Sequence, residues 1–269
     1  MAWFTRSSRC TLLAVALTLG LSVSIPVSVQ AQLINSSLGS KLQNAFRPPR
    51  SSGRSGPENT VSGGTRGACM MTNKPLTALV PAFGGKTAAE YPTIFWYAPP
   101  LSAEEAPAPA VEFVLRDANN QVVYSTKYAL EKAAKRVVGT PGIMSLTIAP
   151  LYPLEIGQEY RWELKVRCDG NDPEVLPALV GEGKLQRVEA DPNLALRVQQ
   201  ATLEERVAMY ADQELWYETL DALIKLRRDR PYDQNLADAW EKLLSAVGLA
   251  TISEEPLFQS ASNIQTNNQ

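Results

Sequence analysis

The side chains in this 269-residue chain that could do hydrolytic chemistry are acidic, because the sequence contains no histidine. Its absence excludes Ser-His-Asp and Cys-His nucleophile systems and every zinc site that uses a histidine ligand. Two carboxylates can still cleave a glycosidic bond, one as the acid and the other as the nucleophile or base. The acidic residues near one expected strand are Glu155, Glu159, Glu163, Asp169 and Asp172.

Strand alternation argues against an acid pair among these residues. In a strand, every second side chain points to the same face, so Glu163 shares an outward face with Arg161 and Lys165. A face that carries such alternating charges is typical of a solvated surface. The chain also lacks the glycine-rich nucleotide loops and the G-x-S-x-G motif of α/β-hydrolases. We therefore expect a protein that is not an enzyme, with no catalytic residue, no metal site and no cofactor.

Aromatic side chains are the candidate ligand or partner contacts: Phe95, Trp96, Tyr97, Trp216, Tyr217 and Trp240. In a strand, Phe95 and Tyr97 share one face and Trp96 lies on the other, so an exposed face could stack against sugar rings. The alternative is that helices cover this strand and that the aromatic residues pack in the core. The same two alternatives apply to Trp216 and Tyr217.

The first 31 residues have the pattern of a cleavable signal peptide. Arg6 and Arg9 precede an uncharged apolar run over residues 11–29, and Ala31 ends a segment of small residues suited to signal peptidase. The alternative is an uncleaved membrane anchor. Cleavage would leave a mature chain that starts at Gln32, without a stable membrane span, in the periplasm or outside the cell.

Export changes the meaning of the cysteines. Removal of Cys10 with the signal peptide leaves Cys69 and Cys168 in a compartment that oxidises thiols, which favours a disulfide between them. Two buried free thiols are the alternative.

Residues 32–67 are rich in glycine, serine and proline, a composition that predicts a disordered linker without a core. The segment carries five basic residues and one acidic residue. It is either a basic arm that attracts an anionic cell-envelope polymer or a solvated spacer. The whole chain has a formal charge of -2, so bulk charge gives no reason to expect binding to nucleic acid.

Residues 68–190 predict an all-β domain, an immunoglobulin-like or fibronectin-like sandwich of seven short strands. Asn119 and Asn120 suit a hairpin turn, and Leu154, Gly157 and Tyr160 have the spacing of a tyrosine corner. The expected strands are Leu76 to Val80, Tyr91 to Tyr97, Val111 to Arg116, Gln121 to Tyr128, Ile143 to Ile148, Glu159 to Arg167 and Val180 to Val188.

Residues 191–250 change to helical periodicity. Thr202 and Glu205 have the spacing of a capping box, and Gly248 marks a helix stop. Two of the helices, with Tyr210 and Pro231 at suitable positions, resemble one degenerate tetratricopeptide repeat. The segment either recruits a partner or covers one sheet, and residues 251–269 are expected to form a disordered tail.

The order of several motifs resembles one family of exported proteins. These motifs are Thr65-Arg66-Gly67-x-Cys69, Leu76 to Pro81, Glu90 to Thr93, Thr140 to Ile143, Tyr160-Arg161-Trp162, Gln186 to Val188, Trp216-Tyr217 and Leu226 to Arg228. They resemble the cyanobacterial domain of unknown function nine hundred twenty-eight family, over Thr65 to Leu249. The resemblance implies an exported protein of a Gram-negative photosynthetic cell and brings no activity, substrate or catalytic residue.

These observations predict an exported periplasmic module that is not an enzyme and that binds another envelope or periplasmic protein, or otherwise associates with the envelope. The alternative is a protein that binds glycans through the aromatic sheet face, or cleaves them with a carboxylate pair.

Overall fold

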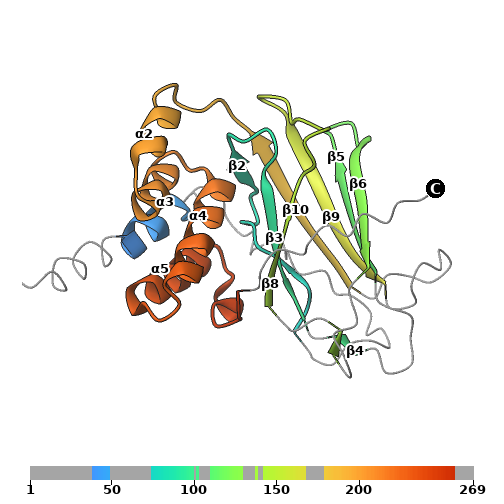
Figure 1. The fold of residues 1–269 in the computed structure, drawn as a ribbon. Coiled ribbons are helices and arrows are strands. Elements are labelled where there is room, and N and C mark those ends of the chain that lie inside the picture. The colour runs from blue at the N-terminus through green and yellow to red at the C-terminus, as the bar shows by residue number, and fades with distance from the viewer. Residues whose placement is uncertain are drawn as a thin grey trace, which may run out of the picture.

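A computed structural model describes residues 38–48, 74–99, 101–102, 110–129, 137–138, 142–167 and 179–257. The described strands lie between residues 77 and 187, and most of the described helices follow them. The helices gather on one side of the strands, next to β2 (Gly85–Thr87) and β3 (Thr93–Ala98) (Figure 1). The chain therefore consists of open β-sheets followed by a helical part that packs directly against them.

The described strands form three sheets. The largest has the order β2-β10-β9-β5-β6, the second has the order β1-β3-β8, and β4 pairs with β7. Pairing is antiparallel throughout, except that β2 runs parallel to β10. The other strands are β1 (Thr77–Ala78), β4 (Leu101–Ser102), β5 (Ala110–Arg116), β6 (Val122–Ala129), β7 (Val137–Val138), β8 (Gly142–Thr147), β9 (Glu159–Arg167) and β10 (Leu179–Arg187).

The period-two pattern of β9 explains how the large sheet is buried. Tyr160, Trp162 and Leu164 are buried, whereas the residues between them carry charge. One face of the sheet therefore contributes to the core and the other is charged. All seven expected strands are present, and the strands missed by sequence are β2, β4 and β7, which have only two or three residues each.

The sheets share a core with each other and with the helices. A side chain at Gly181 of β10 would lie 3.3 Å from Leu76, next to β1, so the large and the small sheet approach closely there. Buried residues of both sheets and of the helices form one hydrophobic cluster. The β part and the helical part are therefore not separated by a polar boundary.

Four α-helices and one 3-10 helix follow the strands: α2 (Leu194–Gln200), α3 (Leu203–Asp212), α4 (Trp216–Asp229), α5 (Gln234–Ala246) and η1 (Ala250–Ile252). The capping box predicted for Thr202 and Glu205 is confirmed at the start of α3. Gly248 follows α5 with a φ of 80°, as expected for a glycine that ends a helix. Most of α4 is buried, because it packs against α3, α5, β2 and β3.

Part of the predicted linker is helical. Residues 38–45 form a helix, and Leu38, Leu42 and Phe46 are buried. The Phe46 ring meets the Trp216 ring edge-on, with 5.0 Å between centroids. The expectation that residues 32–67 contribute no core is therefore wrong for residues 38–48, because three apolar side chains spaced four residues apart bury one face of this helix.

The tail is also ordered where it begins. The amide of Ile143 donates a hydrogen bond to the Pro256 carbonyl at 2.8 Å, and the Trp240 indole donates one to the Ser253 carbonyl at 2.9 Å. Ile252 is buried. The predicted disordered tail is therefore wrong for residues 251–257, which run back onto β8.

Several expectations fall outside the described residues: the signal peptide at residues 1–31, Cys69, Cys168, Asp169 and Asp172. Within the described part of the chain, no helix combines the length and the apolar character needed to cross a bilayer.

Candidate functional site

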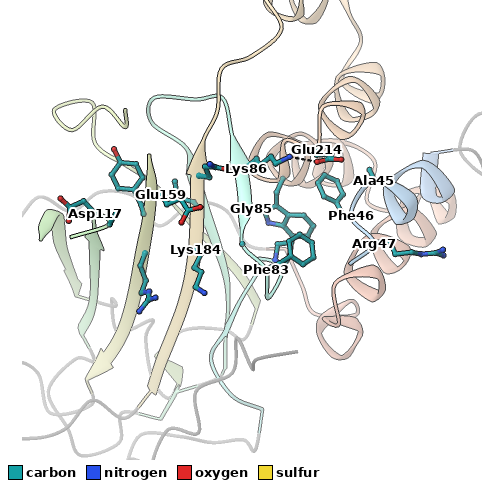
Figure 2. A pocket seen from close by; sticks show the side chains of 18 of the residues that line it. Ala45, Phe46, Arg47, Phe83, Gly85, Lys86, Asp117, Glu159, Lys184 and Glu214 are labelled. Atoms are coloured by element: carbon teal, nitrogen blue, oxygen red, sulfur yellow. Dashed lines mark hydrogen bonds and ion pairs between the residues drawn. The ribbon is translucent and has the colours of Figure 1, made fainter. Parts of the chain in front are cut away.

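A groove of about 990 Å³ lies where the large sheet meets the helix at residues 38–45. Its lining comes from six separate parts of the chain: residues 44–47, the segment 81–86, the turn 117–120, the start of β9, the end of β10, and Glu214 with Trp216 at the start of α4. Figure 2 shows Phe46 and Arg47 on one side of this groove and Asp117 on the other, with Gly85 and Lys184 between them.

Two aromatic anchors build the wall between the groove and the helical part. The Trp216 indole donates a hydrogen bond to the Leu79 carbonyl at 2.9 Å, and the Tyr217 hydroxyl donates one to the Lys184 carbonyl at 3.1 Å. A Cβ atom at Gly85 would lie 2.9 Å from atoms of both aromatic rings. Glycine is therefore required at this point for α4 to approach β2.

A buried carboxylate makes the next contact between α4 and the sheet. Glu218 Oε1 accepts hydrogen bonds from the Thr87 hydroxyl at 2.7 Å and from the amides of Ala88 and Ala89 at 2.8 and 2.9 Å. Burial raises the pKa of Glu218 above its ordinary value, although these hydrogen bonds oppose the shift. Glu218 therefore joins the two parts of the fold beside the groove but does not line it.

The open face of the large sheet carries a row of three basic residues: Arg161 and Lys184 line the groove, and Arg116 precedes Asp117 of the lining without being part of it. Arg161 on β9 lies directly opposite Arg116 on β5 and directly opposite Lys184 on β10. Arg161 and Lys184 are exposed. Residues paired in this way project to the same side of a sheet, so the three cationic side chains share one face.

Two further charges of the groove form an ion pair with each other. Lys86 on β2 forms an ion pair with Glu214 at 2.7 Å, which Figure 2 shows at the edge of the sheet. Glu159 lies in the groove on the same face as Arg161. Phe83, which is 52% exposed, is the large apolar side chain that the described lining presents to solvent.

The six aromatic residues singled out by sequence are all buried. Their exposed fractions are 3% or less, so the structure places Phe95, Trp96, Tyr97, Trp216, Tyr217 and Trp240 in the core. The helical part covers β3 through α4, which is the second of the two alternatives considered from the sequence. The alternative of an aromatic sheet face open to sugar rings is therefore wrong for Phe95, Trp96 and Tyr97.

The core gives these aromatic residues polar partners. Burial, together with the carboxylate of Glu255, raises the pKa of Tyr97 to about 12. The guanidinium of Arg227 lies over the Trp240 ring, 5.1 Å from its centroid, in a cation–π contact. Trp216 reaches the groove wall, but as a buried anchor and not as an open platform.

The acidic residues near β9 do not converge on one point. Glu159 and Glu163 are four residues apart on the same strand, a separation of about 13 Å between their Cα atoms. Carboxyl groups that cleave glycosidic bonds are closer than that, at about 5 to 9.5 Å. Glu163 is paired with Lys165 at 2.9 Å, as the shared outward face predicted, and Glu155 is exposed.

Sequence reasoning missed the basic row and the groove. Arg161 was assigned correctly to the outward face of its strand, but a single sequence does not show that β5 and β10 are its neighbours. Phe83 precedes β2 and Lys86 lies in it. This strand has three residues and is too short to give a periodic signal. Among the described residues, no cluster of three or more side chains suitable for holding a metal ion is present.

Comparison with solved structures finds partial matches to large glycosidases. A protein named as a beta-galactosidase from Bacteroides fragilis matches with a TM-score of 0.22 and 10% identity, over 42% of this chain and 15% of that one. The Parabacteroides merdae beta-glucuronidase matches with a TM-score of 0.23 and 12% identity, over 42% and 13%. This chain thus spans less than a sixth of either protein, and similarity at this level supports no conclusion about fold or activity.

Comparison with curated proteins gives no match. Comparison with protein-family models gives a match over residues 61–257, which include both the sheets and the helical part. Residues 65–249, which carry the sequence motifs noted above, lie within that range. The chain belongs to the family described as Domain of Unknown Function (DUF928).

Proposed function

We propose that this chain is an exported binding protein of the cell envelope, without enzymatic activity, and that the groove between the large sheet and the 38–45 helix is its binding surface. The observation that carries this proposal is the groove itself. It presents the exposed Arg161 and Lys184 beside the half-exposed Phe83, in a cavity large enough for a ligand of several hundred cubic ångströms.

The proposal of export rests on the sequence at the N-terminus. Arg6 and Arg9, the apolar run after them and Ala31 support a signal peptide that is cleaved before Gln32. The first buried residue of the described helix, Leu38, comes six positions after that site. Cleavage would therefore leave the whole groove intact in the mature chain, and a Cys69–Cys168 disulfide is proposed to form in the same compartment.

Two finer features of the fold also belong to the proposal. The amide of Glu155 donates a hydrogen bond to the Tyr160 hydroxyl at 2.9 Å, and Gly157 has a φ of 82°. This contact supports a tyrosine corner and hence an immunoglobulin-like arrangement of the sheets. The packing of α3 on α4 supports a degenerate tetratricopeptide-like unit, whose role would be to hold the groove wall in place.

The proposal that the chain has no enzymatic activity rests on the positions of the acidic side chains among the described residues. Glu159 is the acidic residue of β9 that lines the groove, and its neighbour Glu163 on the same face is held by Lys165. The other carboxylates of the described lining are already engaged: Glu214 is paired with Lys86, and Asp117 accepts hydrogen bonds from the amides of Asn119 and Gln121. We therefore expect a glycan that enters the groove to be bound and not cleaved.

Photocrosslinking in the native host tests this function. A benzophenone amino acid replaces Phe83 in one strain and Tyr232, which is 91% exposed on the helical part, in another. We expect an adduct of higher mass in the envelope fraction from position 83 and none from position 232, and a mature N-terminus at Gln32. Equal adducts from both positions, or a chain retained in the cytosol with Met1 in place, would overturn the proposal.

A further inference from the structure

We propose that the ligand of this groove is an anionic polysaccharide, held by the row of Arg116, Arg161 and Lys184 across three neighbouring strands. This inference rests on the proposed function, because it names the class of ligand for the same groove. It is independent of the basic arm considered for residues 32–67, since all three cations belong to the large sheet.

The register of the sheet fixes the spacing of the charges. Arg116, Arg161 and Lys184 are direct partners on β5, β9 and β10. Neighbouring strands lie about 4.8 Å apart, so the row extends over about 10 Å. The register therefore places the Cα atoms of the three basic residues side by side across the sheet.

No ion pair neutralises the three residues of the row within the part of the chain that the structure describes. Like charges directly opposite one another on adjacent strands destabilise a sheet. None of the three residues forms an ion pair with another described residue; Arg116 instead donates a hydrogen bond to the Asn120 carbonyl at 3.2 Å. An anionic ligand would therefore remove a repulsion that the folded protein otherwise keeps.

Acidic residues on both sides of the row limit the kind of anion. Glu159 lies two residues before Arg161 on the same face of the sheet. Glu163 lies two residues after Arg161 on that face, directly opposite Glu182 on β10. Double-stranded DNA carries about one charge per 1.7 Å of its length, so its phosphates would meet these carboxylates. A polymer with more widely spaced carboxylates or sulfates can place its charges on the row alone.

The rest of the lining favours a sugar over an acidic peptide. Phe83 is the exposed large apolar residue of the described lining, and the other large apolar side chains, those of Phe46, Tyr160, Leu185 and Trp216, are buried. Peptide ligands depend on apolar anchors that fill desolvated pockets, and the described groove offers no row of such pockets. A hydroxylated chain with one ring lying on Phe83 and its acidic groups on the row matches this surface.

Binding assays with defined polymers test the inference. The mature chain from Gln32 is titrated with polygalacturonate, which carries carboxylates, with dextran sulfate, which carries sulfates, and with neutral dextran. We expect binding to at least one acidic polymer that weakens steeply with salt, and no binding to neutral dextran. The two acidic probes distinguish carboxylated from sulfated ligands.

Charge reversal locates the site. The double variant Arg161→Glu, Lys184→Glu alters two exposed residues of the row and should weaken binding at least about tenfold. The control Arg230→Glu, Lys225→Glu makes the same change of charge on α4 and at its end, outside the described lining of the groove. It breaks the ion pairs with Glu204 and Asp221, but it should still bind within about twofold of the parent. Circular dichroism of both double variants establishes that the fold is retained.

Each outcome decides between the two proposals. Equal weakening by both double variants, binding of neutral dextran, or no binding of either acidic polymer would overturn the polysaccharide inference. If the acidic polymers fail to bind while Phe83 still crosslinks in the envelope, the groove remains a binding surface and only its ligand class is wrong. Shortening of polygalacturonate chains during the assay would instead overturn the proposal that the protein is not an enzyme.

Discussion

The Tyr217 hydroxyl accepts a hydrogen bond from the Trp162 indole nitrogen at 3.3 Å and donates one to the Lys184 carbonyl at 3.1 Å. Tyr217 is the second residue of α4, and Trp162 lies in the middle of β9. This buried chain of hydrogen bonds therefore ties the helical part to the strand that carries one of the groove's cations. Burial raises the pKa of Tyr217, so the hydroxyl keeps its proton and can donate.

Removal of this hydroxyl should destabilise the whole fold. Tyr217→Phe leaves a buried indole N–H and a buried carbonyl without their partner, and we expect a loss of about 1 to 3 kcal/mol in the free energy of unfolding. Urea denaturation followed by tryptophan fluorescence measures it. Tyr232→Phe, at an exposed tyrosine, should change the free energy of unfolding by less than about 0.5 kcal/mol. Equal stabilities for the two variants would show that the buried hydroxyl contributes nothing.

The Trp162 ring also requires a glycine beside it. A Cβ atom at Gly183, the direct partner of Trp162 in the sheet, would lie 2.5 Å from ring atoms. Gly183→Ala should therefore cost about 1 to 3 kcal/mol through overpacking. Trp162→Phe removes the part of the ring that the new methyl group meets, so adding Gly183→Ala to that variant should cost less. A double-mutant cycle in urea measures this coupling, and strictly additive losses would contradict the proposed clash.

The strands and helices with a clear period were predictable from sequence. β9 has nine residues in strict alternation, and its predicted bounds match those observed. The capping box at Thr202 and Glu205 likewise gave the start of α3. In both cases a local pattern and the tertiary contacts favour the same structure, which is why sequence reasoning succeeds there.

The elements that sequence reasoning missed are short or depend on distant partners. The 38–45 helix lies in a segment rich in glycine and serine, and the spacing of Leu38, Leu42 and Phe46 is too short a pattern to predict that it packs against Trp216 and α5. The groove depends on strand order, because β5 is a neighbour of β9 in the sheet although β6, β7 and β8 lie between the two in sequence. The basic row follows from that order, and no local pattern records it.

For the aromatic residues, sequence reasoning offered a binding role that the structure does not support. Phe95, Trp96 and Tyr97 alternate across β3, so a sheet with one open face would expose part of the run. The structure instead buries both faces of β3, because α4 packs on this strand and the large sheet belongs to the same core. Aromatic composition alone does not separate a covered strand from a ligand platform.

The N-terminal helix should contribute measurably to stability if it is part of the core. Phe46→Ala removes a ring that packs on Trp216, and we expect a loss of about 3 kcal/mol in the free energy of unfolding. Guanidinium denaturation measures the loss, and limited trypsinolysis should show faster cleavage after Lys41. Asn44→Ala, at an exposed position of the same helix, is the matched control and should leave both readouts near those of the parent. Parent-like stability of Phe46→Ala would mean that the helix is not docked in solution.

Glu218 should make stability depend on pH. Burial raises its folded-state pKa above 4.5, so above pH 4.5 the native state holds a proton that the unfolded state has lost, and the free energy of unfolding falls as pH rises towards the folded-state pKa. Glu218→Gln keeps an oxygen acceptor for Thr87 and does not titrate, so its stability relative to the parent should increase with pH across this window. Urea titrations from pH 4 upward measure the difference. Glu241→Gln, at an exposed carboxyl on α5, controls for the loss of one negative charge. Parallel pH profiles for Glu218→Gln and the parent would contradict the role of burial.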